Sequence, residues 1–479
     1  MADRLKILLA SAEVVPFSKV GGLADVAGAL PKALAELGLD VRVVTPNHMR
    51  QNKVSGLTPV GSFSTPMGEV NLRAASLNEH VPVYLVENSR YFDRPGIYSE
   101  DDDLERYLLF SRAVFEVPKS LGWQPDIYHC NDWHTAIVPL WLKALAKVDP
   151  FYARSASILT VHNLAYQGVY ERERVLRAIR EDVLAAPFSA SNEHLANLMR
   201  EGLRSADAIT TVSKRYAQEI QTREYGEGLD YLMRERKDRL FGIINGLDYE
   251  ELNPATDRHL VSNYDVSSIE RKADNKAALQ RRVGLPERPG VPVIGMVSRL
   301  ADQKGLDILQ SALHDLVTRS ELQLVILGTG EQKYHDSLKD VPSRYPGKVA
   351  IVFAFDAALA QLIYAGSDMF IMPSRFEPCG LGQLMALRYG TIPVVRHTGG
   401  LVDTITDYNS NPQSGNGFAF TDYSPQALLN AVERAVTAYR SRDEWRKLIV
   451  RGMESDFSWD NSARQYEEMY RRIMTSVGA

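Results

Sequence analysis

Residues 5–38 read LKILLASAEVVPFSKVGGLADVAGALPKALAELG. Residues 5–11 form a short apolar run, which is typical of a buried strand, and a loop with two adjacent glycines follows it. Apolar residues then recur at helical spacing until Gly38, at Leu23, Val26, Ala27, Leu30, Leu34 and Leu37. The segment therefore predicts one strand, a glycine-containing loop and one helix, in that order.

The same alternation continues along the chain and then restarts. Further strands are predicted at 41–45, 81–87, 126–130, 156–162 and 207–213, with helical stretches such as 104–122 between them. A second series begins after Asn245, with strands predicted at 291–298, 322–328, 349–355, 368–373 and 391–395. Repeated βα units predict an α/β protein with two doubly wound, Rossmann-like domains and mostly parallel sheets.

The domain boundaries follow from these two series. We assign residues 1–245 to an N-terminal domain, 246–458 to a C-terminal domain and 459–479 to a final helix, which is expected to cross back to the first domain. Proline and short polar residues place a hinge between Gly246 and about Tyr264. Two such domains would face each other across a deep cleft, where ligands bind beyond the carboxyl ends of the strands.

Composition and charge argue against several classes of protein. The 479 residues are 45% hydrophobic and 24% charged, which is ordinary for a globular protein. With 55 Lys and Arg against 60 Asp and Glu, there is no basic block for binding nucleic acid. No apolar run is long enough for a membrane helix and no signal-peptide core is present, so we expect a cytoplasmic protein without a membrane partner. Cys130 and Cys379 are expected to be reduced, forming neither a disulfide nor a zinc cluster.

The first candidate site is SKVGGLAD at residues 18–25. Gly21 and Gly22 lie where a helix begins, so unpaired backbone N–H groups could bind an anion there. Lys19 adds a flexible positive charge suited to a diphosphate. The segment matches neither the nucleotide P-loop nor the dinucleotide Gly-x-Gly-x-x-Gly pattern. The alternative interpretation is a tight strand-to-helix turn with a solvated lysine.

A pair of cations follows the first strand of the second domain. The segment SRLADQKG at 298–305 contains Arg299 and Lys304. A guanidinium fork and an ammonium group could together hold a departing diphosphate without a metal. The alternative is that both are solvated surface cations.

A carboxylate follows the fourth strand of the same domain. In PSRFEPCGLGQ at 373–383, Glu377 lies between Phe376 and Pro378 and is therefore held in place. It could accept hydrogen bonds from sugar hydroxyls or stabilise a cationic sugar transition state. Its alternative role is a charge partner at a helix start. The next loop, HTGGL at 397–401, repeats the Gly-Gly helix start and predicts a second anion site.

Other polar segments bear on metal binding. HCNDWH at 129–134 and VHNL at 161–164 follow strands, but they lack the spacing of zinc-binding histidines, so zinc is a weak interpretation. The three aspartates at 101–103 precede a predicted helix and indicate an acidic helix start more than a metal motif.

Taken together, these segments resemble those of bacterial glycogen synthase and plant starch synthase. The motifs are KVGGL at 19–23, DWH at 132–134, HNL at 162–164, NGLD at 245–248, 298–305, 375–383 and TGGL at 398–401, which span almost the whole chain in the family's order. The resemblance implies a GT-B fold and retaining transfer of glucose from ADP-glucose to the non-reducing end of an α-1,4-glucan. ADP would be released, and glycogen or malto-oligosaccharides would be acceptors. No cofactor or metal is expected.

The resemblance also implies roles for individual residues. The diphosphate would be bound by Lys19, Arg299 and Lys304, with backbone help from Gly21, Gly22, Thr398, Gly399 and Gly400. His162 resembles the histidine that contacts the transferred glucose, and Glu377 the carboxylate that fixes its hydroxyls. Residues expected in the sugar cleft are Asp25, Asp132 and Asn163; the donor-binding segments also contain Asn245, Cys379, Gly380 and Leu381.

Two departures and several alternatives accompany this interpretation. Many related retaining transferases have a second glutamate where this chain has Met385, as is usual in the synthases themselves. Phe355 stands where the family commonly has a tyrosine stacked on adenine, so the choice between ADP-glucose and UDP-glucose stays open. The alternatives are a UDP-glucose transferase of the same fold and a catalytically inactive glucan-binding protein. A glucan phosphorylase would normally need a longer chain and pyridoxal phosphate. The sequence does not indicate an oligomeric state.

Overall fold

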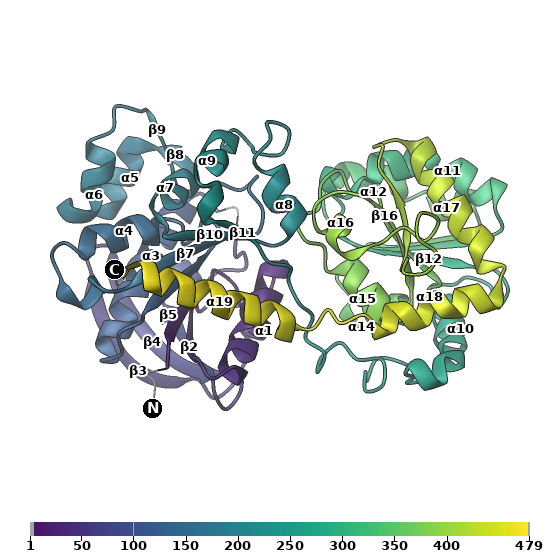
Figure 1. The fold of residues 1–479 in the computed structure, drawn as a ribbon, viewed down its shortest axis with the longest axis horizontal. Helices are drawn as coiled ribbons and strands as arrows, with labels where there is room; N and C mark the ends of the chain where they lie inside the picture. The colour runs from purple at the N-terminus through teal and green to yellow at the C-terminus, as the bar shows by residue number, and fades with distance from the viewer. Residues whose placement is uncertain (1–3, 99, 478–479) are drawn as a thin grey trace. The chain divides into compact units, whose positions relative to one another are not determined.

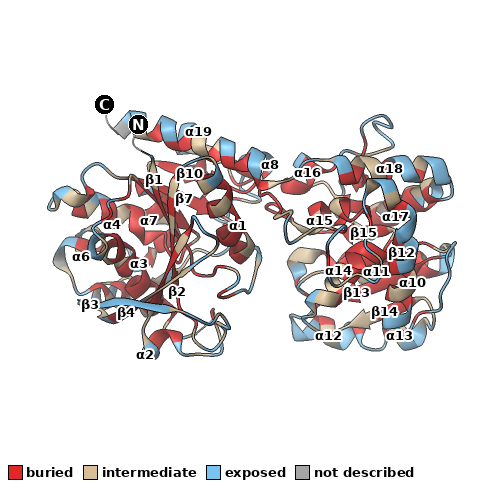
Figure 2. Ribbon diagram, turned by 90° about the horizontal axis from the view of Figure 1, so that it is seen from below, coloured by how far each residue is buried: buried red, intermediate tan, exposed pale blue. Residues whose placement is uncertain are grey.

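The computed structural model describes residues 4–98 and 100–477 and divides into two compact units. Unit 1 comprises the chain up to Gly246 together with the last helix, and unit 2 is Leu247–Ser458 (Figure 1). In each unit buried strands run through the centre. The helices cover these strands, and their outer faces are exposed (Figure 2). No helix in the described ranges is long and apolar enough to cross a membrane.

Unit 1 is built on a nine-stranded sheet with the order β11-β10-β7-β6-β1-β2-β5-β4-β3. All neighbouring pairs are parallel except those made by β4, which is antiparallel to both β5 and β3. The strands are β1 (Lys6–Ala10), β2 (Asp40–Pro46), β3 (Thr58–Thr65), β4 (Gly68–Ser76), β5 (Pro82–Glu87), β6 (Ile127–Asn131), β7 (Ala156–Val161), β10 (Ala208–Thr211) and β11 (Leu240–Gly242). A separate antiparallel pair is formed by β8 (Val169–Glu171) and β9 (Leu195–Asn197).

The helices of unit 1 follow its strands along the chain. They are α1 (Gly22–Glu36), α2 (Ser89–Phe92), α3 (Asp103–Ser120), α4 (Ile137–Leu145), α5 (Arg172–Ile179), α6 (Asp182–Ser189), α7 (Leu198–Ser205), α8 (Lys214–Glu219), α9 (Asp230–Glu235) and α19 (Trp459–Val477), with short 3₁₀ turns at Pro150–Tyr152 and Lys237–Arg239. Helix α1 buries the apolar face that the sequence predicts, including Leu23, Val26, Leu30 and Leu34.

The C-terminal helix α19 is part of unit 1 and lies beside α1 (Figure 1). Its buried aromatic and apolar residues join the core that also contains strands β1 and β2. Two polar contacts fix it further: the Tyr470 hydroxyl lies 2.7 Å from His129 Nδ1, and Ser462 Oγ donates to the Ile244 carbonyl at 2.6 Å. The last helix therefore completes the first unit although it follows the second in sequence.

Unit 2 is built on a six-stranded, fully parallel sheet with the order β14-β13-β12-β15-β16-β17. Its strands are β12 (Val293–Val297), β13 (Gln323–Leu327), β14 (Val349–Val352), β15 (Met369–Met372), β16 (Ile392–Arg396) and β17 (Phe418–Phe420). Its helices are α10 (Lys272–Arg282), α11 (Leu306–Arg319), α12 (Gln332–Leu338), α13 (Val341–Arg344), α14 (Ala357–Gly366), α15 (Gly382–Arg388), α16 (Gly400–Thr404), α17 (Pro425–Tyr439) and α18 (Arg442–Glu454), with 3₁₀ turns at Val266–Arg271 and Asp302–Lys304.

Three details differ from the sequence-based expectations. The unit boundary falls between Gly246 and Leu247, one residue later than assigned. Strand β14 ends at Val352, so Phe355 lies in the loop beyond the strand and not at its end. The β3–β4 hairpin was not predicted, because β3 is exposed along most of its length and lacks the alternation of a half-buried strand.

Candidate active site

Most candidate residues of unit 1 follow the carboxyl ends of the adjacent strands β1, β6 and β7, and Asn245 follows β11. Asn131 donates from Nδ2 to the Ala10 carbonyl at 3.1 Å, which ties the end of β6 to the end of β1. Asp132 follows with a left-handed φ of 55°, and its Oδ1 accepts a 2.7 Å hydrogen bond from the His162 backbone N–H. The structure thus brings Asp132 and His162 together, as their positions after neighbouring strands indicate.

The tautomer of His162 follows from its partner. Asn131 Nδ2 is already a donor, so its Oδ1 is the atom that accepts from His162 Nε2, at 2.9 Å. Nε2 therefore carries the proton and Nδ1 is left as a hydrogen-bond acceptor. Burial lowers the pKa of His162 to about 3, so the ring is neutral at physiological pH. A neutral imidazole suits hydrogen bonding to a sugar hydroxyl more than binding of a phosphate charge.

The loop before α1 carries a contact that sequence reasoning missed. Lys19 Nζ lies 2.6 Å from Asp25 Oδ1, so these two expected site residues pair with each other. Glu13, which is buried, accepts hydrogen bonds from the backbone N–H groups of Val20 and Gly21. The Gly21 N–H, which was expected to contact an anion, points at Glu13 in this structure, and its role toward a ligand stays a prediction.

Two carboxyl groups among the candidate residues of unit 1 have raised pKa values. Burial raises the pKa of Glu13 to about 7, although the N–H groups of Val20 and Gly21 act to lower it. Burial likewise raises the pKa of Asp132 to about 7 against the backbone hydrogen bonds of His162 and Asn163. The charge of Glu13 also acts to raise the pKa of Asp132.

Two other residues of unit 1 that were expected in the site are Asn163 and Asn245. Asn163 is half-buried and its Oδ1 accepts from the Ala165 N–H at 3.1 Å, as in a turn. Asn245 is buried, and its Oδ1 has no hydrogen-bond partner among the described residues. An unsatisfied buried acceptor of this kind is suited to a ligand or a water.

In unit 2 the central feature is an ion pair between Lys304 and Glu377. Lys304 Nζ lies 2.9 Å from Oε1 and 2.7 Å from Oε2 of the carboxylate, and Ser374 Oγ donates to Oε2 at 3.0 Å. The Glu377 side chain is 7% exposed and that of Lys304 21%. The two residues are supplied by the loops after the adjacent strands β12 and β15, so the fold places a cation and a carboxylate side by side at one edge of the sheet.

The glycines of unit 2 let these loops approach one another closely. A Cβ on Gly399 would lie 2.0 Å from the Glu377 carbonyl oxygen, and one on Gly400 2.1 Å from that of Cys379. The Gly400 N–H donates to the carbonyls of Glu377 and Pro378, at 3.1 and 3.2 Å. The Gly400 N–H, which was expected to contact an anion, holds the Glu377 loop in this structure, and its role toward a ligand stays a prediction.

Replacing Gly399 by alanine is expected to destabilise unit 2 by about 2–4 kcal/mol and to lower activity, because the φ of 47° and the blocked space both oppose a side chain. Gly290→Ala is the matched control, since a Cβ there would meet nothing within 4 Å. Thermal unfolding of the two variants measures the difference. Equal midpoints would show that the Gly399 loop moves freely enough to accept a methyl group.

The remaining expected residues of unit 2 either lie close to the Glu377 loop or are exposed elsewhere in the unit. Thr398 and Cys379 are buried beside the Glu377 loop, and the Thr398 hydroxyl has no hydrogen-bond partner among the described residues. Gly380 has a φ of 74° and leads into Leu381, the residue before α15. Arg299 is exposed after β12. Phe355 is 78% exposed after the edge strand β14, and no described contact joins it to the other candidate residues.

Comparisons with known proteins identify the family. The model of the starch synthase catalytic domain matches residues 6–235, and that of glycosyl transferases group 1 matches residues 280–449. The chain is 50% identical to the glycogen synthase of Moorella thermoacetica over 99% of this chain and 98% of that protein. The chain belongs to the glycogen synthase family. It is a glycosyltransferase.

Further relatives agree with this family and show the fold. The chain is 46% identical to the glycogen synthase of Desulforudis audaxviator, over 100% of this chain and 98% of that protein. The catalytic domain of starch synthase IV from Arabidopsis thaliana, solved with ADP and acarbose bound, is 32% identical with a TM-score of 0.89, covering 99% of this chain and 100% of that one. The fold is therefore GT-B, with two Rossmann-like units.

Asp102 and Asp103 of the acidic segment have structural partners in this glycogen synthase family member. Asp102 pairs with Arg94 and Asp103 with Arg106, at the start of α3. The pKa of buried His134 is lowered by burial, so it too is neutral. Within residues 4–98 and 100–477, no group of three or more His, Cys, Asp or Glu is placed to hold a metal ion.

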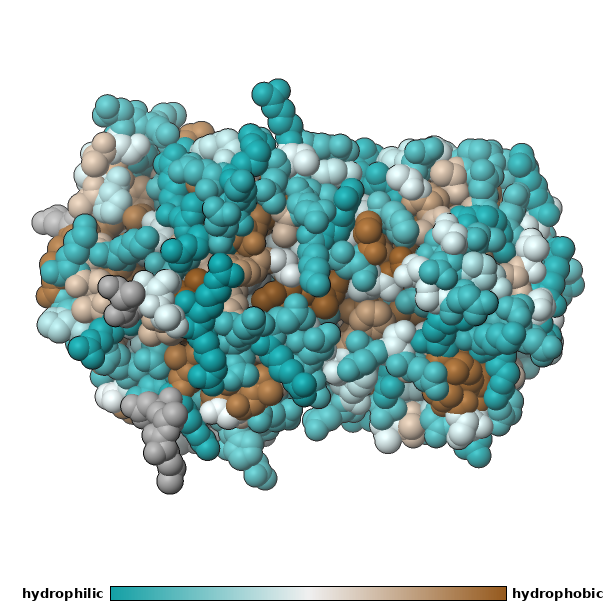
Figure 3. Space-filling model, in the orientation of Figure 1, coloured by the Kyte–Doolittle hydropathy of each residue, from teal (hydrophilic) through white to brown (hydrophobic). Residues whose placement is uncertain are grey.

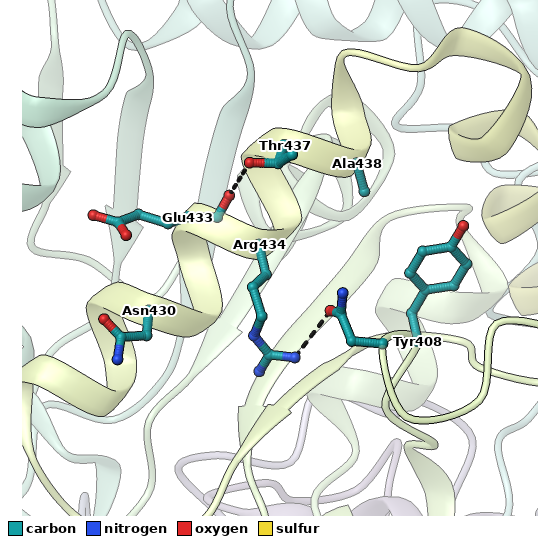
Figure 4. A pocket seen from close by; sticks show the side chains of 7 residues that line it. Tyr408, Asn430, Glu433, Arg434, Thr437 and Ala438 are labelled. Atoms are coloured by element: carbon teal, nitrogen blue, oxygen red, sulfur yellow. Dashed lines mark hydrogen bonds between the residues drawn. The ribbon is translucent and has the colours of Figure 1, made fainter.

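A surface pocket of about 520 Å³ lies away from these residues in unit 2 (Figure 4). It is lined by one face of α17 and the loop before β17, with Tyr408, Asn430, Glu433, Arg434 and Thr437 among its residues. Arg434 is held there by Asp407, at 3.0 Å. None of the family's expected residues lines this pocket.

Proposed function

We propose that the chain transfers glucose from ADP-glucose, with retention, to the non-reducing end of an α-1,4-glucan and so elongates glycogen or a related polymer. The observation that carries the proposal is the Lys304–Glu377 pair, which puts a cation for a leaving diphosphate beside a carboxylate for the sugar. The ADP and acarbose bound to the Arabidopsis relative support a nucleotide and a glucan as ligands.

Positive side chains are assigned to the diphosphate. We assign Lys19, Arg299 and Lys304 to its oxygens, with the N–H groups at Gly22, Thr398 and Gly399 as further donors. Lys19 and Lys304 are each paired with a carboxylate in the structure, so each would exchange that partner for a phosphate oxygen. Arginine and lysine stabilise the charge that grows on a leaving diphosphate, so the proposal assigns no metal.

The transferred glucose is assigned to Glu377 and His162. The Glu377 carboxylate would accept hydrogen bonds from sugar hydroxyls, and His162 Nδ1 is an acceptor for another hydroxyl. Asp25, Asp132, Asn163 and Asn245 are assigned to the surroundings of the donor and acceptor sugars. Bond-making would occur on the face that the diphosphate leaves: the acceptor oxygen bonds to C1, the C1–O bond to the phosphate breaks, and the hydroxyl proton moves to the leaving oxygen.

The donor is tested by incubating the protein with glycogen and either ADP-glucose or UDP-glucose, measuring diphosphate release and glucan growth together. The proposal expects faster elongation from ADP-glucose. Faster elongation from UDP-glucose would keep the reaction and change the donor. Binding of glycogen without elongation from either donor would favour a glucan-binding protein.

Replacing Phe355 by alanine is expected to raise KM for ADP-glucose about 2- to 10-fold with little change in kcat, since stacking of this exposed ring on adenine would contribute equally before and during the reaction. Val148→Ala, another exposed apolar residue, serves as control. A fall in kcat at unchanged KM would contradict the assignment of Phe355 to the base.

A further inference from the structure

Glu13 lies in the loop after β1 and precedes the KVGGL segment at 19–23. It lies between β1 and α1, and its carboxylate accepts hydrogen bonds from two backbone N–H groups of the following loop. The Gly21 nitrogen lies 3.3 Å from both carboxylate oxygens, and the Val20 nitrogen is closer still. One side chain therefore holds the middle of the loop that carries Lys19.

The carboxylate reaches this loop from the interior of unit 1. Glu13 is 2% exposed, and its neighbours Ala12 and Val14 are fully buried. Its own carbonyl oxygen accepts from Ser11 Oγ at 2.7 Å, which fixes the backbone at this point. On the other side of the loop, Val20 is 54% exposed. Glu13 therefore supports the loop from beneath, while the outer side stays open to solvent.

We propose that Glu13 is a positioning residue, which fixes the Lys19–Gly22 loop so that the Lys19 ammonium and the start of α1 are presented to the diphosphate of the donor. This inference rests on the proposed function. The inward hydrogen bond of the Gly21 N–H fits this role, because it orders the outer surface of the loop before the donor binds. Preorganised donors of this kind bind an anion without a further ordering step.

The pKa of the Glu13 carboxyl group depends on its burial and on the groups around it. The groups that face it are Asp25 on α1, Asp132 after β6, and Tyr98 and Tyr107 from the segment around the start of α3. The Asp25 carboxylate acts to raise the pKa of Glu13, whereas the Tyr98 side chain acts to lower it, and the nearby cation Lys19 is paired with Asp25. Burial has the largest effect and raises the pKa of Glu13 to about 7.

The sign of the pH effect follows from this raised pKa. A carboxyl group whose pKa rises from 4.5 in the unfolded chain to about 7 in the fold favours folding most when it is protonated. Its contribution to stability therefore declines as the pH rises from about 4.5 to about 7. At pH 8 an ionised Glu13 opposes stability, which a neutral side chain would not do. A residue that lowers stability at working pH is expected where function requires it.

Glu13→Gln tests the inference, with Glu36→Gln on the exposed end of α1 as the matched control. At pH 8 the Kd for ADP, measured by calorimetry, is expected to rise about tenfold in Glu13→Gln, because an amide accepts weaker hydrogen bonds than a carboxylate. Its unfolding midpoint at pH 8 is expected to equal or exceed that of the wild type. The weakening of wild-type ADP binding between pH 8 and pH 6 is expected to be smaller in the variant.

The outcomes separate this inference from the proposed function. Wild-type ADP affinity and pH dependence in Glu13→Gln would overturn the positioning role and leave the proposed function intact. A lower unfolding midpoint at pH 8, with ADP affinity lost in proportion, would assign Glu13 a purely structural role. If the wild type binds ADP but does not elongate glucan, the proposed function fails while the Kd comparison still decides the role of Glu13. No ADP binding by the wild type would overturn both.

Discussion

Lys304→Ala is expected to lower kcat for glucosyl transfer by about 10²- to 10³-fold, the loss typical when one charge-stabilising group is removed from an active site. The ammonium lies beside Glu377 at the end of β12 and is assigned to the leaving diphosphate. Negative charge on the leaving group grows in the transition state, so the lysine should matter more to turnover than to the binding of ADP-glucose. Initial-rate kinetics at saturating glycogen give kcat and KM separately.

The control for Lys304→Ala is Lys447→Ala, which removes an exposed lysine paired with Glu444 on α18 and should leave activity unchanged. Thermal unfolding of both variants separates loss of activity from loss of fold, because Lys304→Ala also leaves Glu377 without its cation. A rise in KM at unchanged kcat would show that Lys304 stabilises the bound substrate and the transition state equally, and would contradict its assignment to the leaving diphosphate.

Glu377→Gln is expected to lower kcat by a similar factor of about 10²–10³. Unlike Lys304→Ala, it is not expected to remove a group that binds the diphosphate of ADP. Loss of the carboxylate removes the acceptor for sugar hydroxyls and leaves Lys304 without its negative partner. An ammonium that no longer has to leave an ion pair should bind ADP as tightly as in the wild type or more tightly. Calorimetry with ADP, alongside the kinetic assay, measures both effects in one variant.

Glu433→Gln on the exposed face of α17 is the control for Glu377→Gln. The same charge is removed from the same unit, so a change common to both variants would reflect net charge only. Weaker ADP binding in Glu377→Gln, with kcat retained, would mean that the carboxylate organises the nucleotide site and has no part in holding the glucose.

The sequence predicted the two sheets and the edge where the site lies, because βα periodicity determines both. Lys304 and Glu377 follow strands that were each recognisable, so their presence at one edge of the sheet was predictable. Their direct pairing was not, because it depends on a loop approach that glycines at 399 and 400 permit. The inward turn of the Gly21 N–H depended likewise on Glu13, an acid whose burial no periodicity indicates.

Two further features lay beyond sequence reasoning for different reasons. The expected strand through Phe355 ends three residues earlier, because an apolar run does not distinguish a strand from the loop that continues it. The proton on His162 Nε2 follows only from the orientation of the Asn131 amide, which a hydrogen bond to β1 determines. Such details are properties of the packed structure and not of any local segment.

The proposed reaction is retaining transfer of glucose to the non-reducing end of an α-1,4-glucan. It is tested most directly by incubating the protein with ADP-glucose and a short malto-oligosaccharide and following the new anomeric signal by proton NMR. The expected products are an α-1,4 linkage at the non-reducing end and one ADP for each glucose added, and the new unit should be lost on digestion with a non-reducing-end exo-glucanase. A β linkage, addition at the reducing end, or ADP release without growth of the chain would contradict it.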